Sequence, residues 1–267
     1  MMKSDIQYLV EISNKIGAKN SYVQGGGGNT SVKIQDNLMA IKASGYSLKN
    51  MNPKSGFTFV NYNEICKIIK NKKILKFSEN DLDNYVKNKV IEVDGYIKSK
   101  PSIETGFHAL LPYKFIVHTH SVYSNILCCS IEGEQIIKKI FPKSSWVKYA
   151  NPGKNITIEL NKSLGNINPK IIFMQNHGII VANNDPMSIL EQHDLINQKI
   201  INYFNLDKEY HEEDKSFNIE NLKNKVIFPD QIVYLSKEKL KNSLAGKETI
   251  SAYNYIIKNI YSLRLNT

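Results

Sequence analysis

Residues 115–120, Phe-Ile-Val-His-Thr-His, form an apolar run that ends in two histidines separated by one residue. Side chains alternate between the two faces of a β-strand, so a strand here would place both imidazoles on one face. His177 lies in Asn-His-Gly, between two further apolar runs, and offers a third imidazole. Three histidines can hold a divalent metal and leave a position open for substrate. The pattern therefore favours an enzyme over a binding module.

Around this strand, helical and extended patterns are mixed along the chain. Because they do not alternate strictly, we expect an α/β fold with a mostly antiparallel sheet covered by helices. Residues 71–90 favour a surface loop with helical parts, and residues 206–218 a polar linker. The apolar spacing and end signals predict helices over residues 4–17, 63–70, 101–111, 122–130, 186–204 and 246–263. Strands are predicted over residues 37–45, 57–62, 171–175 and 179–182.

The composition is typical of a soluble globular protein, with 42% hydrophobic and 22% charged residues in a chain of 267. No apolar run approaches the roughly 18 residues that span a membrane, and the N-terminus lacks a signal-peptide pattern. Cys66, Cys128 and Cys129 show no disulfide framework, and the adjacent pair is expected to pack in the core. These features predict a cytoplasmic protein with no membrane partner.

The net charge of +10 comes almost entirely from lysine, since Arg264 is the only arginine. Proteins that read nucleic-acid sequence favour arginine for bidentate contacts with bases. No predicted helix carries a basic stripe, so we expect no nucleic-acid partner. A mildly positive field would still help to attract a phosphorylated substrate.

Four consecutive glycines, residues 25–28, support two interpretations. They can form a tight connection between strands that needs positive φ angles. They can also form an anion cradle, in which backbone N–H groups converge on a phosphate and Asn29 adds a side-chain donor. Two further small polar clusters, one at Ser44-Gly45 and one at Ser102, could complete such a cradle. The run matches neither the dinucleotide-binding fingerprint nor the P-loop.

The other histidines and Glu104 are interpreted by their contexts. His108 lies one turn after Glu104 on a predicted helix, which favours a structural role. His193 and His211 lie in polar contexts and are predicted to face solvent. Glu104 can compensate the positive end of a helix, or it can act as a general acid/base beside a metal. The residues alone leave both roles of Glu104 open.

Five short motifs carry a resemblance to a known family. They are residues 26–31 (Gly-Gly-Gly-Asn-Thr-Ser), 42–45 (Lys-Ala-Ser-Gly), 101–104 (Pro-Ser-Ile-Glu), 118–120 (His-Thr-His) and 176–178 (Asn-His-Gly). In order and spacing they resemble the class II aldolase/adducin family, over roughly residues 5–205. Residues 101–112 and 146–153 look most similar to the aldolase part of bifunctional aldolase/short-chain dehydrogenase proteins. The chain is too short for the dehydrogenase part, so it resembles a free-standing aldolase module.

The resemblance implies a fold and a division of the chain. The fold would be a single three-layer α/β/α domain. Residues 1–205 would form the catalytic domain. Residues 206–267 would form a C-terminal extension, with a terminal helix, that packs on the same domain.

The resemblance also implies roles for particular residues. His118, His120 and His177 match the family's metal ligands, usually for Zn²⁺, with Mn²⁺ or Co²⁺ as alternatives. Glu104 matches its catalytic acid/base. Ile103 stands where related aldolases have a hydroxyl donor for phosphate. The phosphate-binding positions themselves are matched by Gly28, Asn29, Ser44, Gly45 and Ser102.

The implied activity is that of an aldehyde-lyase, an aldolase that cleaves or forms a C–C bond in a ketose or sugar phosphate through a metal-stabilised enediolate. Epimerase, dehydratase and decarboxylase activities on the same site stay open. An adducin-like assembly module is a non-enzymatic alternative, which the intact histidines and Glu104 disfavour. The family resemblance further implies a homotetramer and a proton-donating tyrosine, either near the C-terminus or from a neighbouring subunit, for which Tyr113, Tyr253 and Tyr255 are candidates.

Overall fold

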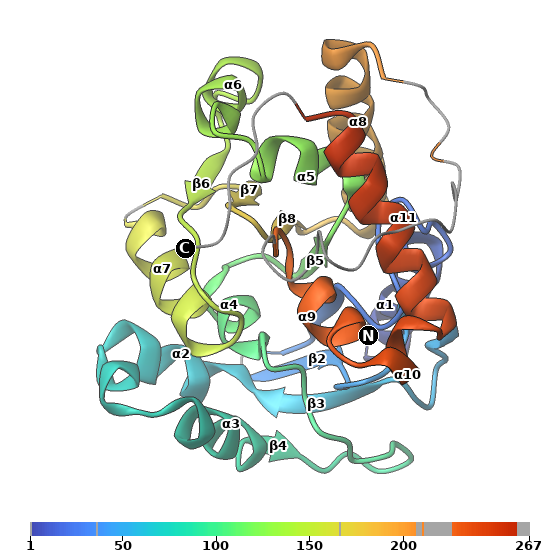
Figure 1. Cartoon of the computed structure of the whole chain (residues 1–267). Coiled ribbons are helices and arrows are strands. Elements are labelled where there is room, and N and C mark those ends of the chain that lie inside the picture. The colour runs from blue at the N-terminus through green and yellow to red at the C-terminus, as the bar shows by residue number, and fades with distance from the viewer. Residues whose placement is uncertain (1, 36, 166, 207–209, 211–225, 261–267) are drawn as a thin grey trace.

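The computed structural model describes residues 2–35, 37–165, 167–206, 210 and 226–260. Its centre is an eight-stranded sheet of order β4-β3-β2-β1-β5-β8-β7-β6 (Figure 1). All neighbouring strands are antiparallel except β6 and β7, which are parallel. The predicted α/β fold with a mostly antiparallel sheet is confirmed. The strands are β1 (Asn29–Lys33), β2 (Leu38–Lys42), β3 (Phe57–Asn61), β4 (Val90–Ile91), β5 (Phe115–Thr119), β6 (Ser145–Val147), β7 (Ile171–Met174) and β8 (Gly178–Asn183).

Strand β5 lies in the middle of the sheet and is buried along its whole length. Phe115 and Val117 pack into the hydrophobic cluster on one face, and Ile116 packs into the cluster on the other. This alternation explains why the first three residues of β5 are all apolar, because a strand covered on both faces buries consecutive side chains.

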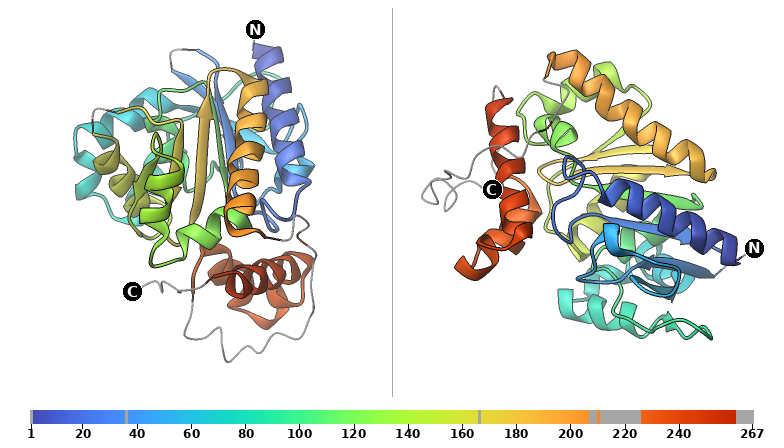
Figure 2. Two further views of the ribbon diagram at one scale, coloured as in Figure 1. Left: turned by 90° about the horizontal axis from the view of Figure 1, so that it is seen from above. Right: turned by 90° about the vertical axis from the view of Figure 1, so that its right-hand side faces the viewer.

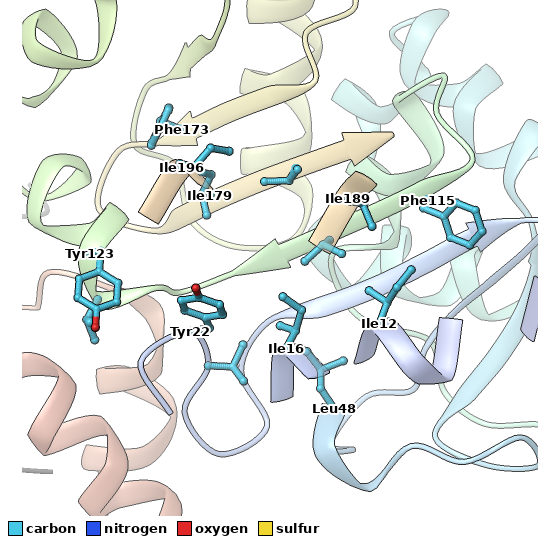
Figure 3. Packing of buried hydrophobic residues seen from close by; sticks show 14 of the residues in the cluster. Ile12, Ile16, Tyr22, Leu48, Phe115, Tyr123, Phe173, Ile179, Ile189 and Ile196 are labelled. Atoms are coloured by element: carbon cyan, nitrogen blue, oxygen red, sulfur yellow. The ribbon is translucent and has the colours of Figure 1, made fainter. Parts of the chain in front are cut away.

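Helices cover both faces of the sheet and give the three layers that were predicted (Figure 2). One face is covered by α1 (Met2–Gly17) and α8 (Pro186–Phe204), which contact each other and strands β1, β5 and β8. The other face is covered by α2 (Tyr62–Lys70), α4 (Thr105–Leu110) and α7 (Lys154–Leu164). Figure 3 shows Ile12 and Ile16 of α1 and Ile189 of α8 packed within the hydrophobic cluster that also holds Phe115.

Smaller elements complete these layers. Residues 71–90 hold the short 3₁₀ helix η2 (Lys73–Lys76) and α3 (Glu79–Lys87), whose first turn has a capping box between Ser78 and Asp81. Another 3₁₀ helix, η1 (Leu48–Asn50), packs against α1. The sequence patterns did not predict α6 (Gly133–Ile140), β6 or α7. The pair Cys128 and Cys129, at the end of α5 (Val122–Cys128), is fully buried as expected.

His193 corrects one prediction. It is fully buried, whereas its polar neighbours suggested a solvent-facing position. Ile189, His193, Ile196 and Ile200 lie three or four residues apart, so they share the face of α8 that packs on the sheet. Within this face His193 Nε2 hydrogen-bonds the hydroxyl of Thr119 at 2.8 Å. His193 is buried because its position along the helix places it on the face that packs on the sheet, whatever the polarity of its neighbours in the sequence. His211 lies outside the described residues.

Three helices near the C-terminus lie together at one end of the molecule (Figure 2). They are α9 (Pro229–Leu235), α10 (Glu238–Lys241) and α11 (Leu244–Lys258). Helix α11 contacts α5, and its Tyr253 and Ile256 belong to the main hydrophobic cluster together with Phe228. The described part of the predicted extension thus shares its core with the preceding residues. The division of the chain at residue 205 stays a prediction, and most of the predicted linker lies outside the described residues. No helix in the described part of the chain has the length and apolarity needed to cross a membrane.

Candidate active site

Three histidines converge at the end of β5. His118 lies in β5, His120 follows it directly, and His177 lies in the turn between β7 and β8. Because β5 pairs with β8, with His118 opposite Ile180, this turn is brought next to the end of β5. The shape of this turn depends on the two residues that flank His177. Asn176 has a φ of 50°, and a Cβ at Gly178 would lie 2.2 Å from the carbonyl oxygen of Thr119.

The geometry of these histidines fits a divalent metal. One ligand atom from each of them lies within 4.8 Å of the others. His118 Nε2 and His120 Nε2 are 3.1 Å apart, close to the roughly 3.3 Å that separates two nitrogens on a tetrahedral Zn²⁺. His177 is fully buried, its Nδ1 atom has no hydrogen-bond partner among the described residues, and its Nε2 atom has only the carboxylate of Glu104, at 2.9 Å. Buried polar atoms are rarely left without a partner, so the site has the donors and the unmet need of a metal centre.

Backbone and carboxylate partners orient two of these rings. The Nδ1 atom of His118 lies 3.0 Å from the carbonyl oxygen of Ile179. Burial lowers the pKa of His118 well below its ordinary value, which keeps the ring neutral. The Nδ1 atom of His120 lies 2.6 Å from Asp230 Oδ2. Burial also lowers the pKa of His120, but the Asp230 carboxylate outweighs it and the net pKa is raised. In both rings Nε2 remains directed at the centre of the cluster.

Glu104 lies beside the histidines, at the N-cap of α4, and is 7% exposed. Its Oε1 atom is 2.9 Å from His177 Nε2, and its Oε2 atom is 3.6 Å from His118 Nε2. Burial alone would raise the pKa of Glu104, but the nearby histidines outweigh it and hold the pKa below its usual range. A buried carboxylate beside three imidazoles can either bind a metal or exchange a proton with a ligand next to it.

A hydrogen-bonded chain holds this carboxylate in place. Asn29 Nδ2 donates to Glu104 Oε2 at 2.6 Å. The Oδ1 atom of Asn29 accepts from His108 Nε2, and His108 Nδ1 lies 2.7 Å from Ser31 Oγ. His108 is fully buried, and burial lowers its pKa to about 3, so the ring is neutral. This agrees with the structural role expected for His108.

Comparison with known proteins supports the same family. The family model described as the class II aldolase and adducin N-terminal domain matches residues 7–198. The chain belongs to this family. The aldolases of the family are enzymes that depend on a divalent metal, in agreement with the cluster of three histidines.

Individual relatives and solved structures share 17–30% of their residues with this chain. The solved N-terminal class II aldolase domain of a conserved protein from Thermoplasma acidophilum has a TM-score of 0.64 and 26% identity, covering 74% of this chain and 93% of that one. YgbL from Escherichia coli, described as a putative aldolase/epimerase/decarboxylase, has a TM-score of 0.54 and 17% identity, covering 83% and 97%, and shows the shared fold alone. YuxG of Bacillus subtilis (strain 168), named an uncharacterized oxidoreductase, is 30% identical over 186 residues. That match covers 66% of this chain and spans about a quarter of YuxG, 26% of its length.

In this member of the class II aldolase/adducin family, most backbone N–H groups of the glycine run already donate hydrogen bonds to other parts of the same chain. The backbone N–H of Gly25 donates to Glu248 Oε2 at 2.6 Å, that of Gly26 to the hydroxyl of Tyr234 at 2.7 Å, and that of Gly27 to a backbone carbonyl at 2.9 Å. A Cβ at Gly26 would lie 2.8 Å from the Tyr234 hydroxyl. The glycines therefore allow close approach, and the anion that meets Gly25 is the carboxylate of Glu248.

A cavity of about 500 Å³ lies between the glycine run and α9. Ile103, half exposed, lies at the edge of the cavity. His118 and His177 are fully buried beside Glu104 and do not line the cavity. The residues predicted to bind phosphate all line this cavity, together with two of the other predicted site residues: Gly28, Asn29, Ser44, Gly45, Ser102, Glu104 and His120.

Four polar residues of the cavity were not predicted: Lys42, Asn151, Asp230 and Tyr234. Lys42 is 4% exposed, and its Nζ donates to the carbonyl oxygen of Gly26 at 2.8 Å. Burial lowers the pKa of Lys42 to about 8, although Glu104 and Asp230 act in the opposite direction. A lysine at a fully buried strand position was a signal that the sequence offered, since a lysine is rarely buried without a specific reason. Asp230 and Tyr234 gave no local signal.

The tyrosines considered from the sequence lie elsewhere. The hydroxyl of Tyr113 donates to the carbonyl oxygen of Asn168, and its ring packs against the second hydrophobic cluster, not in the cavity. Tyr253 is buried in the main core, and Tyr255 packs edge-on against Tyr123. Tyr234 is the tyrosine that lines the cavity.

Proposed function

We propose that this chain is a metal-dependent lyase of the aldolase type, acting on a ketose or sugar phosphate. The observation that carries the proposal is the convergence of His118, His120 and His177 on one point beside the buried carboxylate of Glu104. Membership of the class II aldolase/adducin family supports it. An assembly module would have no need to keep four ionisable side chains buried together, because such burial is costly without a ligand.

The three histidines would hold the metal, which we propose to be Zn²⁺. When bound, such an ion acts as a Lewis acid towards the carbonyl oxygen of a substrate. His118 and His120 supply Nε2 in a fixed orientation, because their Nδ1 atoms are engaged by Ile179 and Asp230. The wide cavity beyond His120 leaves room for a small sugar.

Glu104 would move the proton at the carbon next to the substrate carbonyl. Its orientation is set by Asn29, which occupies one carboxylate oxygen and leaves the other beside His177. A group held in this way loses little freedom when substrate binds, which favours proton transfer.

Tyr234 would donate the proton to the oxygen of the departing carbonyl compound. Its hydroxyl oxygen accepts the N–H of Gly26, so its own proton remains available for a ligand in the cavity. Burial raises the pKa of Tyr234, so the hydroxyl stays protonated at neutral pH. This assignment replaces the three tyrosines considered from the sequence.

The charged end of the substrate would bind at Lys42, in the same cavity. Lys42 is the cationic residue among those that line the cavity, and Ser102 and Asn29 lie near it with side-chain donors. Together with Gly28, Ser44 and Gly45 they form the proposed phosphate site. A phosphate bound here would use side-chain donors more than the amides of Gly25–Gly27, which already have partners.

The experiment is a product analysis. Protein loaded with Zn²⁺ would be incubated with a panel of ketose phosphates, and the released aldehyde would be trapped and identified by mass spectrometry. Cleavage that disappears after chelation and in Glu104→Gln supports the proposal. Inversion at one carbon without cleavage would instead indicate an epimerase, and loss of water or CO₂ a dehydratase or a decarboxylase. No conversion of any ketose or sugar phosphate by metal-loaded protein would contradict it.

A further inference from the structure

The clearest unexplained polar contact in the molecule joins His120 to a residue 110 positions later in the chain. Asp230 Oδ2 lies 2.6 Å from His120 Nδ1. Both side chains are buried, with 3% of Asp230 and 5% of His120 exposed. Asp230 lies in the first turn of α9, immediately after Pro229.

Helix capping does not explain this aspartate. Acidic residues in a first turn usually interact with the helix end while remaining in water. Asp230 is buried away from water, and a buried carboxylate is tolerated only with a specific partner. Its partner is the ring nitrogen of His120 that faces away from the histidine cluster.

This contact determines which nitrogen of His120 is available. With Nδ1–H donating to Asp230, the lone pair of Nε2 is directed at the point shared with His118 and His177. A carboxylate behind a metal-bound histidine fixes the ring and makes it a stronger ligand. Among the three histidines, as far as the structure describes the chain, His120 alone has such a carboxylate: His118 has a backbone carbonyl, and His177 Nδ1 has no hydrogen-bond partner.

We propose that Asp230 is a positioning residue for the metal centre, so that α9 completes the site. The inference rests on the proposed metal-binding role of the three histidines. It extends that role beyond residues 7–198, the part of the chain that matches the family model. Asp230 acts through His120 and does not touch the substrate.

The surrounding contacts show how Asp230 is held. Phe228, fully buried, fixes the start of α9, and the side chain of Gln231 accepts from the backbone N–H of Ile227 at 2.7 Å. Gly27 provides the space. A Cβ at this position would lie 2.9 Å from both carboxylate oxygens of Asp230. Gly27 does not have a positive φ, so an alanine there would act through close contacts, with Asp230 and with the carbonyl oxygen of Gln24 at 3.0 Å, rather than through backbone strain.

Metal affinity is the direct test. Zn²⁺ binding to metal-free full-length protein would be measured by competition with a chromophoric chelator, for wild type, Asp230→Asn and Asp230→Ala. Loss of a carboxylate partner typically weakens metal binding by about 10–100-fold. Asp230→Asn keeps an oxygen acceptor without the charge, so we expect its affinity to lie between those of wild type and Asp230→Ala. Asp194→Asn is the matched control, because it removes a carboxylate that binds Lys19 and Tyr22 away from the site.

Two readouts separate positioning from a general loss of structure. The melting temperature of each metal-free variant shows whether it is folded. Nitrogen NMR of the imidazoles reports whether the proton of His120 remains on Nδ1. Gly27→Ala is a second variant that leaves the carboxylate in the sequence and displaces it, and we expect it to weaken Zn²⁺ binding in the same direction.

The outcomes are distinct. If wild type binds Zn²⁺ and every folded variant binds it within twofold of wild type, Asp230 has no positioning role. If Asp230→Ala does not fold, the comparison of Asp230→Asn and Gly27→Ala with wild type decides in the same way. If wild-type protein binds no divalent metal at all, the proposed function itself fails, and that result is visible without any variant.

Discussion

Asn29 and Glu104 are joined by a buried hydrogen bond of 2.6 Å between Nδ2 and Oε2. Asn29 lies at the start of β1 and Glu104 at the N-cap of α4, so the bond ties the sheet to the helix that carries the carboxylate. Because His108 fixes the other end of the Asn29 amide, the carboxylate has a defined direction before any ligand arrives. Two elements that are 75 residues apart thus set the geometry of one catalytic candidate.

Glu104→Gln should retain the fold and most of the metal but lose most of its turnover. The amide is similar in size to the carboxylate, yet it cannot accept a proton, and a positioned acid/base contributes about 10²–10⁴-fold. The measurement is kcat with the substrate found by product analysis, together with the metal content of the same sample. Turnover close to that of wild type would remove Glu104 from the mechanism.

The histidine cluster predicts one divalent metal per chain. A double variant, His118→Ala with His120→Ala, should lose it, because two of the three nitrogen ligands are removed. Elemental analysis of protein purified without added metal measures the content. Removing the metal from wild type with a chelator should also lower the melting temperature, since a ligand that binds only the folded state stabilises it. Full metal content in the double variant would refute the assignment.

The sequence predicted the parts of the site whose signals are local. A strand ending in His-Thr-His and a turn at Asn-His-Gly each show their chemistry within a few residues, and the order of the motifs predicted the fold. Asp230, Tyr234 and Glu248 could not be found in this way, because they meet their partners across 110, 208 and 223 residues. Nothing in an isolated Pro-Asp-Gln or Gly-Lys-Glu stretch indicates such contacts.

The glycine run shows that a motif can have a cause within the chain that the sequence does not reveal. The sequence suggested that its amides approach an anion, and the amide of Gly25 does so, with the chain's own Glu248. One element that was missed, α7, begins at an unusual backbone position: Gly153, the N-cap of α7, has a φ of 94°. Its buried residues Ile156, Leu160 and Leu164 recur every four residues, a helical spacing, and the helix packs against α2 and α4.

Lys42→Met should weaken the use of a phosphorylated substrate more than that of its unphosphorylated counterpart. A hydrogen bond to a charged group is worth about 1.5–3 kcal/mol, which corresponds to roughly 10–100-fold in kcat/KM. Lys49→Met is the control, because Lys49 is more exposed and pairs with Glu248 instead of lining the cavity. Equal losses for both substrates would mean that Lys42 shapes the cavity without reading the phosphate.

The family resemblance predicts a homo-oligomer, most simply a tetramer. Multi-angle light scattering at micromolar concentration measures the mass directly, and a mass near four times 30.5 kDa is expected. A species that remains at the mass of one chain would contradict the prediction. It would leave the proposed chemistry intact, because the proposed proton donor, Tyr234, belongs to the same chain.

His193 predicts a particular dependence of stability on pH. Burial lowers its pKa from 6.5 to about 4 in the folded protein; Asp194 raises the pKa and Lys19 lowers it, both by smaller amounts. Tyr22 packs against the ring at 4.5 Å between centroids. Between these two pKa values the unfolded chain binds a proton that the folded protein excludes. The contribution of His193 is therefore complete above pH 6.5 and is lost as the pH falls towards 4, at about 1.4 kcal/mol per pH unit.

The comparison of wild type with His193→Gln isolates this effect. Urea unfolding of metal-free protein would be measured at half-unit steps from pH 7.5 to pH 4.5. The glutamine can still bond Thr119 but cannot titrate, so the variant should be less stable than wild type at pH 7.5 and lose less stability on acidification. The difference in slope should correspond to one proton and appear below pH 6.5. Parallel curves for the two proteins would show that His193 keeps an ordinary pKa, and that its burial does not affect acid stability.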